Sequence, residues 1–206
     1  MKKKYAVIVL NLFIAFMSYY CWINMMIGAN GALMSHGLSS LKYFTILSNL
    51  FSGTVSLIYL IALLRDKVTR NIMVWKYYAT VAVTLTFVVV MVFLGPLFTY
   101  KAMFMGMSFW LHGVLPLLAI GEFVLLNKED ITPRENLLSC LSMVIYGFGY
   151  LGNIFINGKG QWPNSNDWYG FLLWGWGIGI VIYIVITIVT WLIGFVLRKA
   201  NRKFRI

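Results

Sequence analysis

Two side chains with complementary chemistry, Thr45 and His112, lie in separate apolar stretches of the chain. A hydroxyl group becomes a nucleophile when a neighbouring base takes its proton, and a neutral imidazole is such a base. Because burial away from water favours the uncharged ring, we expect His112 to act as a base near neutral pH. The pair therefore predicts acyl transfer by a threonine nucleophile.

Three further polar residues, Asn49, Tyr150 and Asn153, are candidates to orient the imidazole or to stabilise an oxyanion, and the sequence does not choose among them. A Ser-His-Asp-type triad is not expected, because Glu122 follows His112 by about 15 Å along a helix. For Glu122 we predict an ion pair with a loop lysine or arginine. A single histidine cannot supply three metal ligands, so neither a metal nor a cofactor is expected.

The polar residues follow helical spacing. Three stripes recur at intervals of three and four residues: Thr45, Ser48, Asn49 and Ser52; Ser108 and His112; and Tyr146, Tyr150, Asn153 and Asn157. Inside an apolar bundle each of these groups requires a partner or a cavity, so we expect the three faces to meet near its outer end. The loop Asn157–Trp168, which contains Trp162, is predicted to lie over this cavity as a lid.

The composition indicates that these residues belong to an integral-membrane protein. Of 206 residues, 61% are hydrophobic and 11% are charged, and the mean hydropathy is +0.81, which excludes an ordinary soluble domain. We predict a single all-α integral-membrane domain, residues 1–206, in which about 20 apolar residues form each span. The six expected helices cover approximately 5–28, 42–64, 77–95, 108–126, 136–157 and 169–197.

The charges predict the orientation of the bundle. The formal net charge is +11, which in a soluble chain would suggest nucleic acid as a partner. Here the charges fall in loops and tails, and 14 of the 17 Lys and Arg residues lie on one side of the predicted spans. By the positive-inside rule, both termini are expected in the cytoplasm of a multi-pass cell-membrane protein, and no nucleic-acid partner is expected.

Three segments resemble motifs of the androgen-induced membrane hydrolases, the family that includes the androgen-dependent regulator of tissue factor pathway inhibitor. The segment Leu41-Lys42-Tyr43-Phe44-Thr45-Ile46 is similar to a Trp-Lys-Phe-Leu-Thr-Phe motif, and Phe44 to Asn49 matches the Phe-Thr-x-x-Ser-Asn pattern of bacterial six-span relatives. Leu111-His112-Gly113-Val114-Leu115-Pro116, followed by Glu122, resembles a second motif of His before Val-x-Pro and then an acid. Gln161-Trp162-Pro163 resembles an aromatic segment between the last two helices.

The resemblance implies a membrane hydrolase with Thr45 as nucleophile and His112 as base. In animals, members of the family cleave fatty acid esters of hydroxy fatty acids through an acyl-threonine intermediate. The partner implied for this chain is a membrane lipid or another fatty-acyl ester. An apolar chamber suits such a substrate, because each buried methylene contributes about 0.8 kcal/mol.

Two other functions fit the same layout. One is the six-span, vitamin-capturing subunit of a small-molecule transporter, in which the polar groups near the outer face bind a ligand. The other is a structural protein, with Gly175 and Gly179 as a close-packing motif in the last helix. Contact between Thr45 and His112 separates these possibilities, because a hydrolase requires a hydroxyl paired to a base and a binding protein does not.

Overall fold

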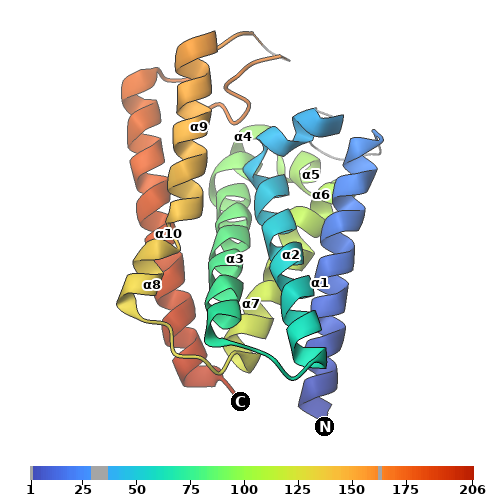
Figure 1. Ribbon diagram of the computed structural model, residues 1–206. Helices are drawn as coiled ribbons and strands as arrows, with labels where there is room; N and C mark the ends of the chain where they lie inside the picture. The colour runs from blue at the N-terminus through green and yellow to red at the C-terminus, as the bar shows by residue number, and fades with distance from the viewer. Residues whose placement is uncertain (1, 29–36, 162–163) are drawn as a thin grey trace.

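The protein is a bundle of helices. The computed structural model describes residues 2–28, 37–161 and 164–206, and every secondary-structure element within these ranges is helical. Six helical stretches among them are long and apolar enough to cross a membrane, which confirms the predicted all-helical, six-span composition. The helices stand side by side, and both ends of the chain lie at the same end of the bundle (Figure 1).

The described residues form thirteen elements, and several spans consist of more than one of them. In chain order they are α1 (Lys2–Met26), the 3-10 helix η1 (Gly37–Lys42), α2 (Phe44–Leu64), α3 (Arg70–Val89), the π-helix η2 (Val90–Leu94), α4 (Gly95–Phe98), α5 (Tyr100–Met103), α6 (Met107–Phe109), the π-helix η3 (Trp110–Val114), α7 (Leu115–Leu126), α8 (Pro133–Leu138), α9 (Leu141–Asn157) and α10 (Trp176–Phe204).

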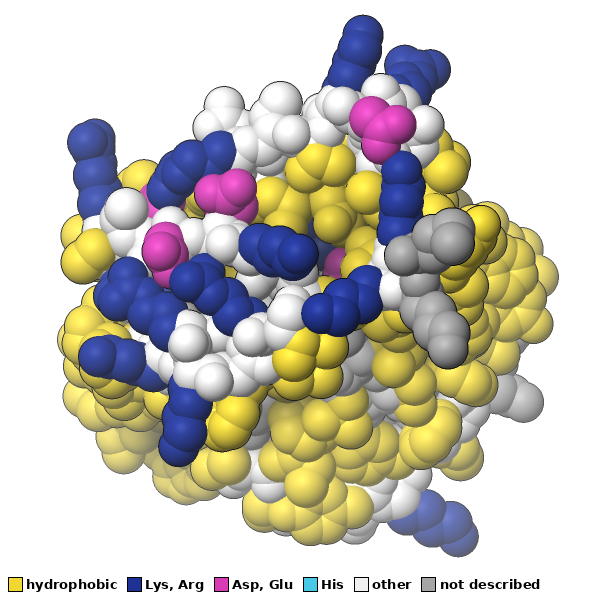
Figure 2. Space-filling view, turned by 90° about the horizontal axis from the view of Figure 1, so that it is seen from below, with side chains coloured by type: hydrophobic (Ala, Val, Ile, Leu, Met, Phe, Trp, Pro, Cys, Tyr) yellow, Lys and Arg dark blue, Asp and Glu magenta, His cyan; other side chains and the backbone are white. Residues whose placement is uncertain are grey.

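The bundle exposes apolar side chains and buries many polar ones. Along α10, the exposed residues include Ile184, Ile188 and Leu192, while Thr190 is fully buried. This distribution suits a lipid environment, in which apolar surface carries no penalty and polar groups must be satisfied internally. Seen from the end that carries the termini, the Lys and Arg side chains gather on one face (Figure 2).

Two helices begin seven residues away from the predicted positions. The third span starts at Arg70 instead of Tyr77, so Lys76 belongs to a helix and not to a loop. The last helix starts at Trp176 instead of Tyr169, because Gly170 and Gly175 adopt left-handed backbone conformations, with φ of 72° and 90°, that a helix cannot contain. Tyr169 and Gly175 therefore precede α10, which leaves only Gly179 of the predicted close-packing pair inside it.

The fifth predicted span is divided into α8 and α9. The Ser139 hydroxyl donates to the Asn136 carbonyl (2.7 Å), and the Cys140 amide donates to the Leu137 carbonyl (3.1 Å). These two bonds, each spanning three residues, form a tight turn between the two helices. At the other end, α8 begins with a capping box in which Thr132 and Glu135 satisfy each other's backbone amides. The span that results, Pro133–Asn157, retains the predicted C-terminal end.

A buried ion pair joins the helices at the end of the bundle near the termini. Lys76 Nζ in α3 donates to Glu122 Oε2 in α7 (2.7 Å), to Asn11 Oδ1 in α1 (2.8 Å) and to Ser56 Oγ in α2 (3.0 Å). Asn11 Nδ2 in turn donates to Glu122 Oε1 (2.6 Å). The predicted ion pair of Glu122 is confirmed, but its partner comes from a neighbouring span, so four helices share one polar network.

We predict that Glu122→Gln destabilises the protein strongly, because it leaves the Lys76 ammonium as an unpaired charge inside the bundle. Removing one partner of a buried ion pair costs about 3–5 kcal/mol. The measurement is thermal unfolding in detergent, followed by intrinsic tryptophan fluorescence, with Tm clearly lower than in the wild type.

The matched control is Asp66→Asn, which breaks the exposed Lys4–Asp66 pair (2.9 Å). Exposed pairs of this kind contribute less than about 1 kcal/mol. Equal Tm values for Glu122→Gln and Asp66→Asn would contradict the role assigned to the buried network.

Candidate active site

The structure brings Thr45 and His112 together. Thr45 Oγ1, at the start of α2, lies 3.4 Å from His112 Nε2 in η3, although 67 positions separate the two residues in the chain. Both side chains are buried, with 4% and 2% of their surface exposed. The contact between a hydroxyl and a base that would separate a hydrolase from a binding protein is therefore present, and it lies toward the end of the bundle opposite the termini.

The second ring nitrogen of His112 determines the direction of this hydrogen bond. His112 Nδ1 lies 2.5 Å from the carbonyl oxygen of Met103. A carbonyl can only accept, so Nδ1 carries the hydrogen, and in the neutral ring Nε2 is then the unprotonated nitrogen. The Thr45 hydroxyl accordingly donates to Nε2. A backbone carbonyl thus takes the orienting role that a carboxylate has in Ser-His-Asp triads.

A short folded segment before α6 places the Met103 carbonyl. It begins at Thr99, whose φ of 80° is unusual for a residue other than glycine, and it ends at Gly106, with φ of 58°. Between these turns lies α5, a single turn capped by the Thr99 hydroxyl, which accepts from the Ala102 amide (3.3 Å). Met103 is the last residue of α5, and the carbonyls of a final helical turn have no partner within the helix. One of them is therefore available to His112.

The π-helical turn that carries His112 is coupled to Pro116. In this wider turn the Leu115 amide donates to the Trp110 carbonyl, five residues earlier. The Leu111 carbonyl would by the same pattern require the amide of residue 116, and proline has no N–H group. A buried carbonyl without a donor is costly, so this position needs a partner from another helix.

Asn49 supplies that partner. Its Nδ2 donates to the Leu111 carbonyl (3.1 Å) and also to the carbonyl of Thr45 (2.8 Å). Asn49 was one of three candidates to orient the imidazole or to stabilise an oxyanion. The structure shows an indirect connection, in which one side-chain amide ties the turn that carries His112 to the turn that carries Thr45.

The same arrangement occurs in the preceding span. The π-helix η2 ends shortly before Pro96, and its Met91 carbonyl, five residues before that proline, accepts a hydrogen bond from the Tyr100 hydroxyl (2.8 Å). In both places a proline leaves a carbonyl unpaired and a polar side chain satisfies it. The two π-helical turns lie on either side of the short segment that presents Met103.

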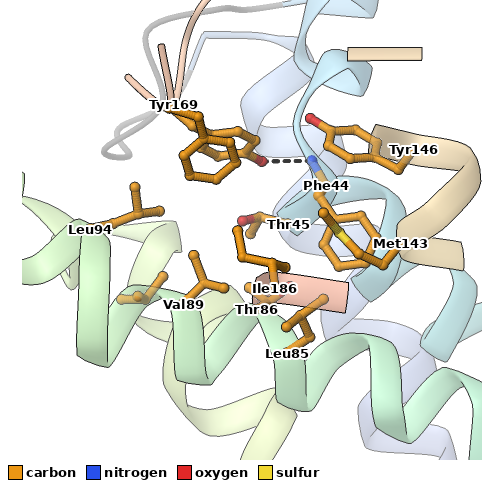
Figure 3. A pocket seen from close by; sticks show the side chains of 12 residues that line it. Phe44, Thr45, Leu85, Thr86, Val89, Leu94, Met143, Tyr146, Tyr169 and Ile186 are labelled. Atoms are coloured by element: carbon orange, nitrogen blue, oxygen red, sulfur yellow. Dashed lines mark hydrogen bonds between the residues drawn. The ribbon is translucent and has the colours of Figure 1, made fainter. Parts of the chain in front are cut away.

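A narrow apolar cavity of about 30 Å³ lies beside the Thr45 hydroxyl. Figure 3 shows this hydroxyl on the cavity wall, with apolar side chains around it. The lining comes from α2, α3, η2, the loop before α10, α9 and α10, and consists of Phe44, Thr45, Leu85, Thr86, Val89, Val90, Leu94, Met143, Tyr146, Tyr169, Phe171 and Ile186.

The loop before α10 forms part of the cavity wall through Tyr169 and Phe171. The Tyr169 hydroxyl accepts a hydrogen bond from the Phe44 amide at the start of α2 (2.8 Å). Trp168 Nε1 donates to the hydroxyl of Tyr146 (3.1 Å), which donates to the Lys42 carbonyl (2.6 Å). The loop is thereby attached to the same helical end that carries the candidate nucleophile.

Tyr150 holds this loop and does not contact the imidazole. Its hydroxyl donates to the carboxylate of Asp167, which also accepts from the Leu172 amide (3.0 Å) and lies 3.8 Å from Lys159 Nζ. Tyr150 and Asp167 are both buried. The carboxylate therefore anchors the loop to α9, a role that the sequence did not indicate.

The remaining predicted site residues lie elsewhere. Asn153 accepts a hydrogen bond from Asn157 (2.9 Å) at the exposed end of α9, and it is not among the residues that line the cavity. Trp162 is outside the described residues. No group of His, Cys, Asp and Glu side chains within the described ranges could hold a metal ion.

Sequence reasoning missed Met103 and Tyr169. Met103 contributes its backbone carbonyl. Every residue has such a carbonyl, so the residue type gives no indication of this role. Tyr169 was assigned to the last helix, and the signal against that assignment was the pair of glycines at 170 and 175. The positions of Pro96 and Pro116 were a signal for the carbonyls that polar side chains must satisfy.

Comparisons with known proteins add no relative: no protein-family model matches the chain, and neither a characterised protein nor a solved structure shows significant similarity to it.

Proposed function

We propose that the protein is an integral-membrane ester hydrolase in which Thr45 is the nucleophile and His112 the general base. The observation that carries this proposal is the hydrogen bond between Thr45 Oγ1 and His112 Nε2, on an imidazole whose other nitrogen is held by the Met103 carbonyl. The resemblance to the androgen-induced membrane hydrolases supports the same pair of residues.

In the first half of the reaction, Thr45 Oγ1 attacks the carbonyl carbon of the ester and His112 Nε2 takes its proton. The tetrahedral intermediate collapses as the bond from the carbonyl carbon to the alcohol oxygen breaks, and the imidazolium returns its proton to that oxygen. While the ring is charged, its Nδ1–H bond to the Met103 carbonyl is charge-assisted and therefore stronger. The products of this half are a free alcohol and an acyl-threonine.

In the second half, a water molecule attacks the acyl carbon and His112 takes a proton from it. The bond to Thr45 Oγ1 breaks, and the proton passes from the imidazolium to that oxygen. One ester and one water become one carboxylic acid and one alcohol, and both side chains return to their starting states. The reaction requires neither a metal nor a cofactor.

A fatty-acyl ester is the substrate class that the apolar walls of this site favour. The cavity beside Thr45 is lined mainly by aliphatic and aromatic side chains, and the protein lies in the phase where such lipids dissolve. Burying an acyl chain contributes about 0.8 kcal/mol per methylene. A water-soluble ester would gain little from the same walls.

We predict that a fluorophosphonate probe labels the purified wild type in detergent and does not label Thr45→Val. Valine has nearly the shape of threonine but has no hydroxyl to react. His112→Ala is expected to label about 10²-fold or more slowly, because general-base catalysis typically contributes a factor of 10² to 10⁴. Labelling rates are read by in-gel fluorescence and the modified residue by peptide mass spectrometry.

The matched control is Thr86→Val, which removes a second hydroxyl from the wall of the same cavity. The Thr86 hydroxyl bonds to Ser48 and to a backbone carbonyl, with no base beside it, so its loss is expected to leave labelling intact. A folded wild type that resists the probe would overturn the hydrolase proposal and favour the ligand-binding alternative.

We also propose that both termini face the cytoplasm and that the Thr45 site opens toward the outer leaflet. The gathering of Lys and Arg at the end of the bundle with the termini supports this orientation (Figure 2). Single cysteines at Lys203 and Lys159, in a background with Cys21 and Cys140 replaced by alanine, are expected to report opposite sides. In intact cells, a membrane-impermeant maleimide is predicted to react at position 159 and not at position 203. The reverse pattern would contradict the orientation.

A further inference from the structure

A second pocket opens at the end of the bundle that carries the termini, opposite the end with Thr45. It has a volume of about 410 Å³, and Lys3, Lys4 and Lys128 contribute to its lining together with several apolar residues. The lining comes from the start of α1, the end of α2, the connections that follow α2 and α7, and Ile206. Figure 2 shows this face of the molecule, on which apolar side chains lie between those of Lys and Arg. The pocket therefore combines positive charge with hydrocarbon walls.

The positive charge of this pocket is only partly balanced from within. Its lining contains three lysines and two carboxylates, those of Asp66 and Glu129. Lys4 pairs with Asp66 (2.9 Å), whereas Lys3 and Lys128 have no ion-pair partner among the described residues. Two ammonium groups at the edge of one pocket are thus free to meet an anion.

A buried hydrogen-bond donor without a partner lies further in. The pocket adjoins a narrower one, with which it shares Tyr59, Met73 and Leu126, and Asn127 lines this inner part. Asn127 is 4% exposed, and its Oδ1 accepts from the Glu129 amide (2.8 Å), which fixes the orientation of the side chain. Its Nδ2 makes no hydrogen bond within the described ranges. A buried donor in this state is costly, so an acceptor at this position would be stabilising.

The other polar groups of the two pockets separate into used and unused donors. Lys76, at the wall of the inner part, already gives its three hydrogens to the buried network described above. The Tyr59 hydroxyl, by contrast, makes no hydrogen bond to a described residue. The unused groups are therefore two ammoniums, one hydroxyl and one amide nitrogen. All of them can donate, so a complementary ligand is an anion with several acceptor oxygens.

We propose that this pocket binds one anionic phospholipid from the leaflet at the same end of the bundle. Its phosphate meets the ammonium groups of Lys3 and Lys128, and Tyr59 and Asn127 donate to lipid oxygens further in. The hydrocarbon next to the headgroup lies against the apolar walls, to which Leu63 belongs. Basic pockets near a membrane surface attract anionic lipids, and the walls favour a lipid over a soluble phosphate, which gains nothing from apolar contact.

The test is native mass spectrometry of the full chain in detergent, with equal amounts of a phosphatidylglycerol and a phosphatidylcholine that have the same acyl chains. The wild type is expected to retain one phosphatidylglycerol in preference to phosphatidylcholine, whose choline group opposes the two ammoniums. Each basic residue near the headgroup favours an anionic lipid about fivefold, so Lys3→Gln/Lys128→Gln is expected to lower the phosphatidylglycerol affinity by about 10- to 30-fold. Equal retention of both lipids by the wild type would show that the pocket does not select an anion and would overturn the inference.

The matched control is Lys199→Gln/Lys203→Gln, which removes the same charge from exposed positions near the end of α10. Neither lysine lines the pocket. Exposed charges away from the ligand are largely screened, so the control is expected to keep an affinity within about twofold of the wild type. If the control loses as much affinity as the pocket variant, the lipid responds to the charge of the whole face, and the inference is wrong.

Tyr59→Phe tests the inner part of the site without changing any charge. It is expected to lower the phosphatidylglycerol affinity by about 3- to 10-fold, the usual contribution of one hydrogen bond, and to keep the Tm of the wild type because the hydroxyl has no partner in the protein. An unchanged affinity in this variant contradicts the proposed site. Displacement of the lipid by an equal concentration of glycerol 3-phosphate would identify a soluble phosphate as the ligand and would also overturn the inference. Fluorophosphonate labelling reports on Thr45 at the other end of the bundle, so neither result depends on the proposed hydrolase function.

Discussion

The geometry of the candidate site depends on one hydrogen bond, from His112 Nδ1 to the carbonyl of Met103. It fixes the tautomer of the ring and turns the unprotonated nitrogen toward Thr45. A carboxylate in that position would need its own partners inside the membrane, because an isolated buried charge is costly. A backbone carbonyl performs the orienting task without adding a charge.

Around that bond, the helices are joined by side chains that satisfy backbone groups left over by irregular turns. Pro116 leaves the Leu111 carbonyl to Asn49, Pro96 leaves the Met91 carbonyl to Tyr100, and the first amide of α2 is taken by Tyr169. In lipid there is no water to fill these positions, so each irregularity fixes the place of one particular side chain. The irregular parts of the helices are therefore the parts that position the site.

The sequence predicts the regular part of this molecule well. Six apolar runs identify the spans. A hydroxyl and an imidazole inside two of these runs are recognisable as candidates, because polar groups within a span require a hydrogen-bond partner or a cavity. Prediction from the sequence fails where backbone geometry determines the role or position of a residue. Met103 acts through its carbonyl, and Tyr169 lies in a loop because two glycines after it take left-handed conformations within an otherwise continuous apolar run. Lys76 was assigned to a loop because charged residues usually lie outside the spans of a membrane protein. In the structure it lies inside a span, where the Glu122 carboxylate on α7 pairs with it.

The pairing of Lys76 with Glu122 also bears on how the chain enters the membrane during synthesis. A lysine within a span opposes insertion by up to about 3 kcal/mol, and its partner lies 46 residues further along. At about 5–20 residues per second, the ribosome needs several seconds to add that distance. During this interval the Lys76 ammonium has only the neutral side chains of Asn11 and Ser56, on the two preceding helices, as partners. The insertion of α3 is therefore expected to be less favourable than its stability in the finished bundle suggests.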